Sequence, residues 1–148
     1  MYKHILVSTD GSKLSGKAIR TAVMLARALG ARVTGVYVIP PYPPPMYGEA
    51  MIYAPAMSSA KYRDSAKRAG KKALAAVEIE AQTAGVACAA ALLAAADPWE
   101  GIVRTAKAKK CDLVVMASHG RRGLSGFLLG SETTKVLTHS KIPVLVCR

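Results

Sequence analysis

The chain has 148 residues, of which 51% are hydrophobic and 20% are charged, and its formal net charge at pH 7 is +12. This length fits one domain over residues 1–148 with its own core, and the composition excludes disordered and collagen-like classes. The longest uncharged apolar stretch, 84–96, is shorter than the ~20 residues that a membrane-spanning helix needs. The first apolar run, Ile5 to Val7, is too short for a signal peptide, so we expect a cytoplasmic protein without a membrane segment.

The chain opens with an apolar segment, residues 2–9, which predicts a first strand ending at Asp10-Gly11. Ser12 is a candidate N-cap for a helix whose apolar stripe begins at Leu14 and closes at Gly30.

A second strand is predicted over 32–39, and the following segment, 40–57, holds most of the eight prolines and is predicted to be a loop. A basic amphipathic helix is predicted over 58–84, with Gly85 as its stop signal. Its outer positions carry six cations: Lys61, Arg63, Lys67, Arg68, Lys71 and Lys72. Because no aromatic residues interleave with them to stack on bases, we interpret them as a solvated helix face and expect no nucleic-acid partner.

Residues 86–96 are predicted to form a buried strand, because they lie between a helix stop and the helix start Asp97-Pro98. Their alanines favour a helix by propensity, so the two signals compete. After the helix that begins near Asp97, a fourth strand is predicted over 112–117, a last helix over 131–140 and a last strand over 142–147.

The cysteines and two of the histidines carry no recognisable site. Cys88, Cys111 and Cys147 are far apart and form no CxxC pair, which favours reduced thiols over a disulfide or a zinc site. His4 and His139 lack partners at metal-ligand spacing, so we interpret them as structural or exposed.

The alternation of strands and helices predicts the α/β class: a single doubly wound domain with a parallel sheet of five strands covered by helices on both faces. In such sheets ligands bind at the carboxyl ends of the strands, where the winding reverses direction. If the first three strands wind one way, the fourth returns beside the first. The crevice then lies between Asp10 and residues 117–120.

A loop with several glycines, residues 120–130, follows the fourth strand and leads into the helix at Ser131. Glycines let backbone amides approach phosphate oxygens, and a helix N-terminus adds donors and a favourable dipole. Arg121 and Arg122 would supply further positive charge. The alternative is an ordinary connecting loop in which Ser131 only caps the helix; the position at the crevice favours phosphate binding.

The stretch Ala117-Ser-His-Gly120, followed after nine residues by Gly130-Ser131, resembles the signature Gly-x2-Gly-x9-Gly-Ser/Thr of the universal stress protein family. Ile5 to Ser12, Val36 to Ile39 and Ile142 to Val146 are similar to the same family, so the resemblance spans the chain. It implies a sheet ordered 3-2-1-4-5 and a bound AMP or ATP, the latter alone or with Mg²⁺. It also implies a homodimer joined through the C-terminal strand, 142–148, and an apolar edge strand invites such pairing.

The resemblance also implies roles for single residues. Asp10 would contact the adenosine part, Val38 would meet adenine through its backbone, and Gly120, Gly130 and Ser131 would hold ribose and phosphates. Simpler interpretations are an N-cap role for Asp10 and core packing for Val38. The predicted nucleotide-binding residues are Asp10, Val38, Ala117, His119, Gly120, Arg121, Arg122, Gly130 and Ser131; we predict no catalytic or metal-binding residue.

Ala117 departs from the signature, which has glycine at that position. We expect its methyl group to crowd the phosphates, so that a glycine there would tighten nucleotide binding.

Two other patterns suggest different chemistry. Gly11 to Ala18 is one residue short of a P-loop, but Ala18 stands where the magnesium-binding Ser or Thr belongs, and the helical stripe begins inside the motif. Ser118 and His119, with Asp10, suggest a hydrolytic triad, but neighbouring residues at a strand end should point in opposite directions. No Gly-x-Ser-x-Gly elbow occurs either.

We therefore predict a nucleotide-dependent stress-response module rather than an enzyme. The alternatives are a slow ATPase at the same site and a basic nucleic-acid-associated protein, which a steep loss of affinity with salt would reveal.

Overall fold

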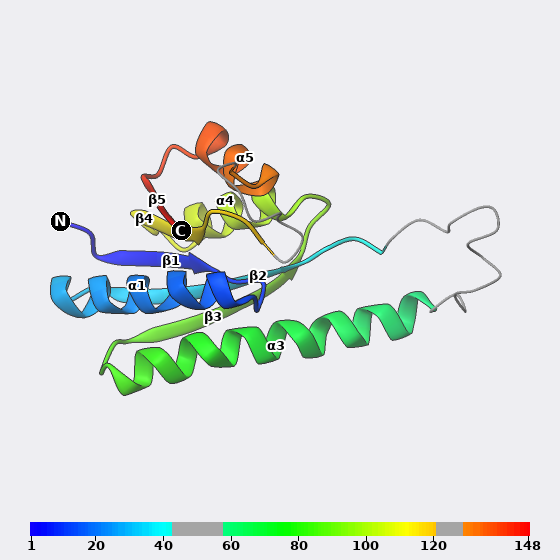
Figure 1. The fold of residues 1–148 in the computed structure, drawn as a ribbon, viewed down its shortest axis with the longest axis horizontal. Helices are drawn as coiled ribbons and strands as arrows, with labels where there is room; N and C mark the ends of the chain where they lie inside the picture. The colour runs from blue at the N-terminus through cyan, green and yellow to red at the C-terminus, as the bar shows by residue number, and fades with distance from the viewer. Residues whose placement is uncertain (43–57, 121–128) are drawn as a thin grey trace.

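A parallel sheet forms the centre of the molecule in the computed structural model, which describes residues 1–42, 58–120 and 129–148. Its five strands are β1 (His4–Ser8), β2 (Arg32–Ile39), β3 (Cys88–Ala94), β4 (Leu113–Ala117) and β5 (Val144–Cys147). They lie in the order β3-β2-β1-β4-β5, and every neighbouring pair is parallel (Figure 1). The doubly wound fold and its strand order are therefore confirmed.

The helices of the described residues cover both faces of this sheet. They are α1 (Lys13–Leu29), α3 (Ser59–Thr83), α4 (Pro98–Ala108) and α5 (Ser131–His139). One core cluster joins α1 and α3 to alternate strand residues such as Ile5 and Val7, and another joins α4 and α5 to the intervening ones such as Leu6. The central strand β1 is thus covered on both sides, and Ile5, Leu6 and Val7 are fully buried.

The strand predicted over 86–96 forms, but the expectation that it is buried is wrong. β3 pairs with β2 along its whole length and, among the strands of the described residues, has no neighbour on its other side, so it is an edge of this sheet. Cys88, Ala89 and Ala90 are exposed. Pairing with β2 overrides the helix propensity of the alanines, and the position at the edge leaves them in contact with solvent.

Local signals fix the ends of α1 as predicted. The Ser12 side chain accepts a hydrogen bond from the amide of Ser15, and Gly30 ends the helix in the left-handed conformation. The cations of α3 lie on its exposed side, as expected for a solvated face. No helix within the described ranges is both long enough and apolar enough to cross a bilayer.

Candidate functional site

Short polar side chains hold the turn from β1 into α1. The amide of Thr9 donates to the carbonyl of Val36 at 3.0 Å, and the amide of Gly11 donates to Thr9 Oγ1 at 3.1 Å. The amide of Ser12 donates to Asp10 Oδ1 at 3.0 Å. Gly11 has a φ of 79°, a left-handed conformation that favours glycine. This turn places Asp10 at the carboxyl end of β1.

Asp10 and Gly120 meet across the sheet. A Cβ built on Gly120 would lie 2.9 Å from Asp10 Oδ2, too close for an ordinary contact. Glycine therefore allows the chain after β4 to approach the tip of β1. The structure brings these two predicted residues together at the point where the winding reverses, as the sequence indicated.

The chain leaves β4 and returns into α5 at almost the same place. The amide of Gly130 donates to the carbonyl of Ser118 at 2.7 Å, and Thr133 Oγ1 donates to the carbonyl of Ala117 at 3.0 Å. A Cβ on Gly130 would lie 3.1 Å from His119 Cα. The N-terminus of α5 is thereby fixed beside the end of β4, with its first amides available to an anion.

These contacts change the roles of Gly130 and Ser131. The Gly130 amide already has a partner in the Ser118 carbonyl, and this glycine packs closely against residues 118–119; its contact with a phosphate stays a prediction. Gly130 is also the N-cap of α5, so the alternative that Ser131 is the cap is wrong. Ser131 is the first helical residue and is exposed, which leaves its hydroxyl group accessible.

Val38 contributes its backbone at the same edge. Residues two apart on a strand direct their amides and carbonyls to the same neighbour, and the Val36 carbonyl is bonded to Thr9, just past the end of β1. The backbone of Val38 therefore points beyond the end of β1, toward the crevice. Its half-buried side chain packs with the α4 layer, so core packing and a backbone directed past the end of β1 coexist at this residue.

The expected crowding by Ala117 is not supported by the direction of its side chain. Leu113 and Val115 belong to the core on the α1 side of the sheet, and Val114 and Met116 belong to the core on the α4–α5 side. Alternation along β4 puts the methyl group of Ala117 on the α1 side. It points away from the layer that contains α5 and its N-terminal amides.

Ser118 and His119 were expected to point in opposite directions and to be poorly placed to hydrogen-bond, and this expectation is wrong. Ser118 Oγ lies 3.2 Å from His119 Nδ1. β4 ends at Ala117, and the two following residues form a bend, so strict alternation no longer applies to them. Ser118 is nevertheless 5% exposed and its backbone is tied on both sides, to Cys147 and Gly130. A buried hydroxyl is poorly placed to attack a substrate.

One contact near the site could not be predicted from sequence. Glu132 Oε2 accepts a hydrogen bond from the amide of Trp99 at 2.8 Å, while Asp97, the N-cap of α4, makes no capping bond with its side chain. Lys135 lies 3.4 Å from both Asp97 and Glu132, and its hydrogen bond to Glu132 raises its pKa. The first turns of α4 and α5 are thereby joined. Only the tertiary packing of the two helices reveals this pairing.

The remaining predicted residues divide into two groups. Arg121 and Arg122 lie outside the described residues, as do most of the predicted loop 40–57 and the glycines of the loop between 121 and 128. Gly16 and Lys17, by contrast, lie inside α1, and the amide of Gly16 donates to the carbonyl of Ser12. The near-match to a P-loop is therefore the first turn of a helix and not an anion-binding loop.

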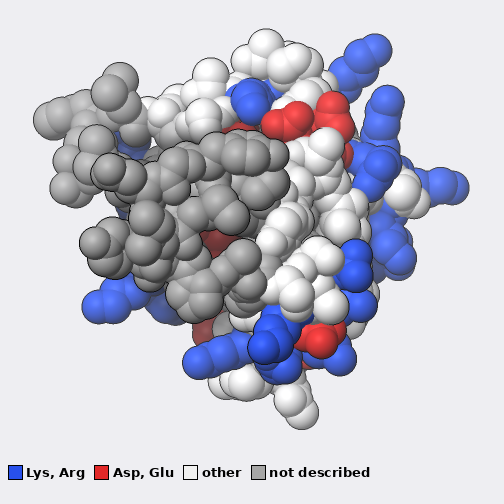
Figure 2. Space-filling view, turned by 90° about the vertical axis from the view of Figure 1, so that its right-hand side faces the viewer, with Lys and Arg blue, Asp and Glu red and all other residues white. Residues whose placement is uncertain are grey.

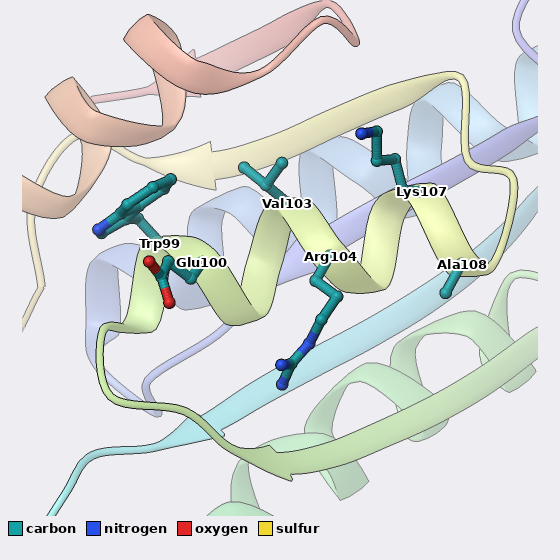
Figure 3. A pocket seen from close by; sticks show the side chains of 6 residues that line it. All are labelled: Trp99, Glu100, Val103, Arg104, Lys107 and Ala108. Atoms are coloured by element: carbon teal, nitrogen blue, oxygen red, sulfur yellow. The ribbon is translucent and has the colours of Figure 1, made fainter.

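Two hollows on the described surface lie away from this crevice. One, of about 570 Å³, is lined by side chains of α4 alone (Figure 3): Trp99, Glu100, Val103, Arg104, Lys107 and Ala108. Another, of about 470 Å³, lies between α4 and the edge strand β3. The first is an open depression along one helix, so it lacks the opposing walls that enclose a small ligand. Within the described ranges, no group of three His, Cys, Asp or Glu residues is placed to hold a metal ion.

Fold and crevice together define a class of protein: a doubly wound α/β domain with a polar crevice at its topological switch point. The sequence model of the universal stress protein family matches residues 1–148, and the chain belongs to this family. A universal stress protein of Methanocaldococcus jannaschii is 34% identical over 149 residues, which cover 100% of this chain and 83% of the relative. Another, of Bacillus subtilis, is 32% identical over 157 residues and all of both chains.

Solved structures agree with this assignment. A second Methanocaldococcus jannaschii protein superposes with a TM-score of 0.79 at 26% identity, covering 99% of this chain and 96% of that one. A universal stress protein solved in complex with cAMP has a TM-score of 0.73 at 24% identity, covering 99% and 97%. One from Archaeoglobus fulgidus, in complex with dAMP, has a TM-score of 0.65 at 21% identity, covering 99% and 98%. At these identities the last two show a shared fold.

Proposed function

We propose that this protein binds an adenine nucleotide, ATP or AMP, in the crevice between the carboxyl ends of β1 and β4, and acts as a nucleotide-dependent module in a stress response. The observation that carries the proposal is the contact of Asp10 with Gly120 at the switch point, beside the N-terminus of α5. That two proteins of the same fold were solved with cAMP and dAMP supports an adenine nucleotide as the ligand class.

Three sets of groups would bind the nucleotide. The carboxylate of Asp10 suits the hydroxyl groups of a ribose, and the backbone of Val38 offers an amide and a carbonyl to the edge of adenine. The hydroxyl and amide of Ser131, with the following amides of α5, suit phosphate oxygens. His119 and Gly120 would lie between these two regions. Mg²⁺ would enter with ATP, bound to its phosphates.

Binding rather than hydrolysis is proposed because only Asp10 and His119, among the described residues of the crevice, could serve as the general base for an attacking water molecule. Ser118 is buried, and Asp10 Oδ1 already accepts the amide of Ser12. Nucleotide occupancy would instead act on the joined first turns of α4 and α5. We further propose that two copies of the chain pair through the outer edge of β5. The side chain of Leu145 on this strand is 39% exposed, and an apolar edge strand invites pairing with another chain.

Calorimetric titration of ATP and AMP into two matched variants tests the site. In Gly120→Ala the new methyl group would displace Asp10 Oδ2, so we expect at least a ~10-fold loss of affinity, about 1.4 kcal/mol or more. Lys17→Ala serves as the control, because Lys17 is exposed on α1, and its affinity should stay within about twofold of the wild type.

Circular dichroism should show that both variants fold. Unchanged affinity in Gly120→Ala, or a loss confined to Lys17→Ala, would move the site away from the β1–β4 crevice. Release of ADP or AMP from ATP over time would favour the slow ATPase instead.

A further inference from the structure

The N-terminal half of α3 carries a dense group of cations on its outer side. Within residues 61–72, Asp64 is the single acidic residue, against six exposed Lys and Arg side chains: Lys61, Arg63, Lys67, Arg68, Lys71 and Lys72. In the described part of the chain, none of the six forms an ion pair. We refer to these six residues as the α3 cationic band.

The position of the band within its helix is electrostatically unfavourable. A helix N-terminus carries a partial positive charge, which acidic residues offset, yet α3 has no acidic residue in its first turn and no basic residue in its last. Lys67 with Lys71, and Arg68 with Lys72, place like charges four residues apart, and each such pair costs about 0.2–0.5 kcal/mol. The dipole effect falls off within the first turn and so concerns Lys61, whereas the like-charge pairs lie along the band. An anion bound along the band would relieve the repulsion of these pairs.

The side chains of the α3 cationic band lie on the outer side of the helix, which faces solvent. α3 extends past the carboxyl ends of the strands (Figure 1). There Tyr62 Oη donates to the carbonyls of Pro40 and Pro41 at 3.2 and 3.1 Å, and its ring packs edge-on against Tyr42. These contacts fix the inner side of the helix, so its outer side faces solvent. Figure 2 looks onto this end of the molecule, where most of the visible charged side chains are Lys and Arg.

We propose that the α3 cationic band binds the phosphate backbone of duplex DNA without regard to its sequence. At a rise of 1.5 Å per residue the band extends over about 17 Å, the length of duplex axis along which one strand presents about five phosphates, one per 3.4 Å of axis. The aromatic residue among these cations, Tyr62, contacts Pro40, Pro41 and Tyr42, which argues against base stacking. Backbone contacts, however, position a protein on a duplex without reading bases.

An anionic membrane fits the band less well. Peripheral helices insert large apolar side chains beside their cations. The exposed large hydrophobic residues of the described chain include none within 59–72. A regular array of phosphates is therefore the partner that the band matches best.

Fluorescence anisotropy with a labelled 20-base-pair duplex of random sequence tests the proposal. The variant is the triple substitution Lys67→Gln, Arg68→Gln and Lys71→Gln. The matched control, Lys107→Gln, Lys109→Gln and Lys110→Gln, removes the same charge from exposed positions at the end of α4. Both are measured in the full chain at about 50–200 mM KCl, with circular dichroism as the check on folding.

We expect wild-type affinity to fall steeply with salt. The band variant should lose at least ~10-fold at about 100 mM KCl, and its log–log salt slope should be shallower by about 3. The control should lose less than about threefold. Equal losses in the two triple variants would show a net-charge effect and overturn the proposal. The proposal would also be overturned if the wild type did not bind the duplex at about 50 mM KCl. Tighter binding to phosphatidylserine vesicles than to the duplex would overturn it as well. ATP titrations of both variants should match the wild type, which separates this surface from the crevice.

Discussion

Ala117 stands where the family signature has glycine, and its methyl group lies on the α1 side of the sheet, with Leu113 and Val115. Because that side is opposite α5, we expect Ala117→Gly to change the affinity for ATP and for AMP by less than about twofold. The added backbone freedom should lower the stability of the empty protein by about 0.5–1 kcal/mol. Calorimetry and thermal melts measure the two effects. Several-fold tighter ATP binding would show that the methyl group faces the ligand after all.

His4 gives a pH dependence to the stability. It is buried, and its Nε2 lies 2.8 Å from Thr34 Oγ1. Burial, and to a lesser degree the charge of Arg32, lowers its pKa below the usual 6.5. The unfolded chain therefore binds a proton near pH 6.5 that the folded chain does not, so the free energy of unfolding should fall as the pH drops below about 6.5.

Urea denaturation between about pH 7.5 and pH 5 measures this fall, and His4→Gln should flatten the curve over that range. Asp112 does not change the free energy of unfolding over this pH range. Burial raises the pKa of its carboxyl group, but the hydrogen bonds from the amides of Lys3 and His4 outweigh burial and lower the pKa. The stability that Asp112 contributes is therefore lost only below about pH 4. A wild-type stability that stays constant down to pH 5 would contradict the role of His4.

Which residues of the site could be predicted depends on how local their signals are. Asp10 and Gly120 follow from the ends of two strands and the winding rule, so their approach was predictable. The partner of the Gly130 amide and the bond between Ser118 and His119 depend on how the chain bends after β4. The bond between Glu132 and Trp99 depends on the packing of two helices, which periodicity does not encode.

At the scale of elements, β5 is a sheet edge whose outward groups can be identified. The carbonyls of Pro143 and Cys147 bond to β4, so the alternating residues Val144 and Val146 direct their backbone outward. We expect Val146→Pro to convert the proposed dimer to a monomer, because proline removes an outward amide and leaves the β4 ladder intact. Multi-angle light scattering measures the mass. Val146→Thr keeps the amide and should remain a dimer; a folded Val146→Pro dimer would place the interface elsewhere.

The helices and strands differ in how well the sequence pattern predicted them. Strong periodicity and clear end signals predicted α1 and the central strands, and Ser12 and Gly30 marked both ends of the helix. The alanine-rich segment at β3 was correctly predicted as a strand but wrongly as buried. An uncharged run gives no information on whether a strand lies inside a sheet or at its edge. That information comes only from the order of the strands.

At the scale of the whole molecule, the winding of the sheet determines where the ligand would bind. β2 and β3 lie on one side of β1, and β4 and β5 lie on the other, so the turn after β1 and the chain after β4 diverge from adjacent strands. Asp10, Val38, Gly120 and Ser131 come from four separate segments that reach the carboxyl edge of the sheet. The proposed function requires that a nucleotide binds there.

Amide chemical-shift mapping of the isotope-labelled full-length protein during a titration with ATP is the most direct test. We expect saturable shifts at Asp10, Val38, Gly120 and Ser131, and small shifts at Gly16, Lys17 and the residues of the α4 hollow. Saturable shifts centred on the first turn of α1 or on α4, with the β1–β4 crevice unperturbed, would contradict the proposed site. The absence of any saturable shift up to about 1 mM ATP would also contradict the proposed site. A dissociation constant of about 1 mM corresponds to only about 4 kcal/mol of binding free energy.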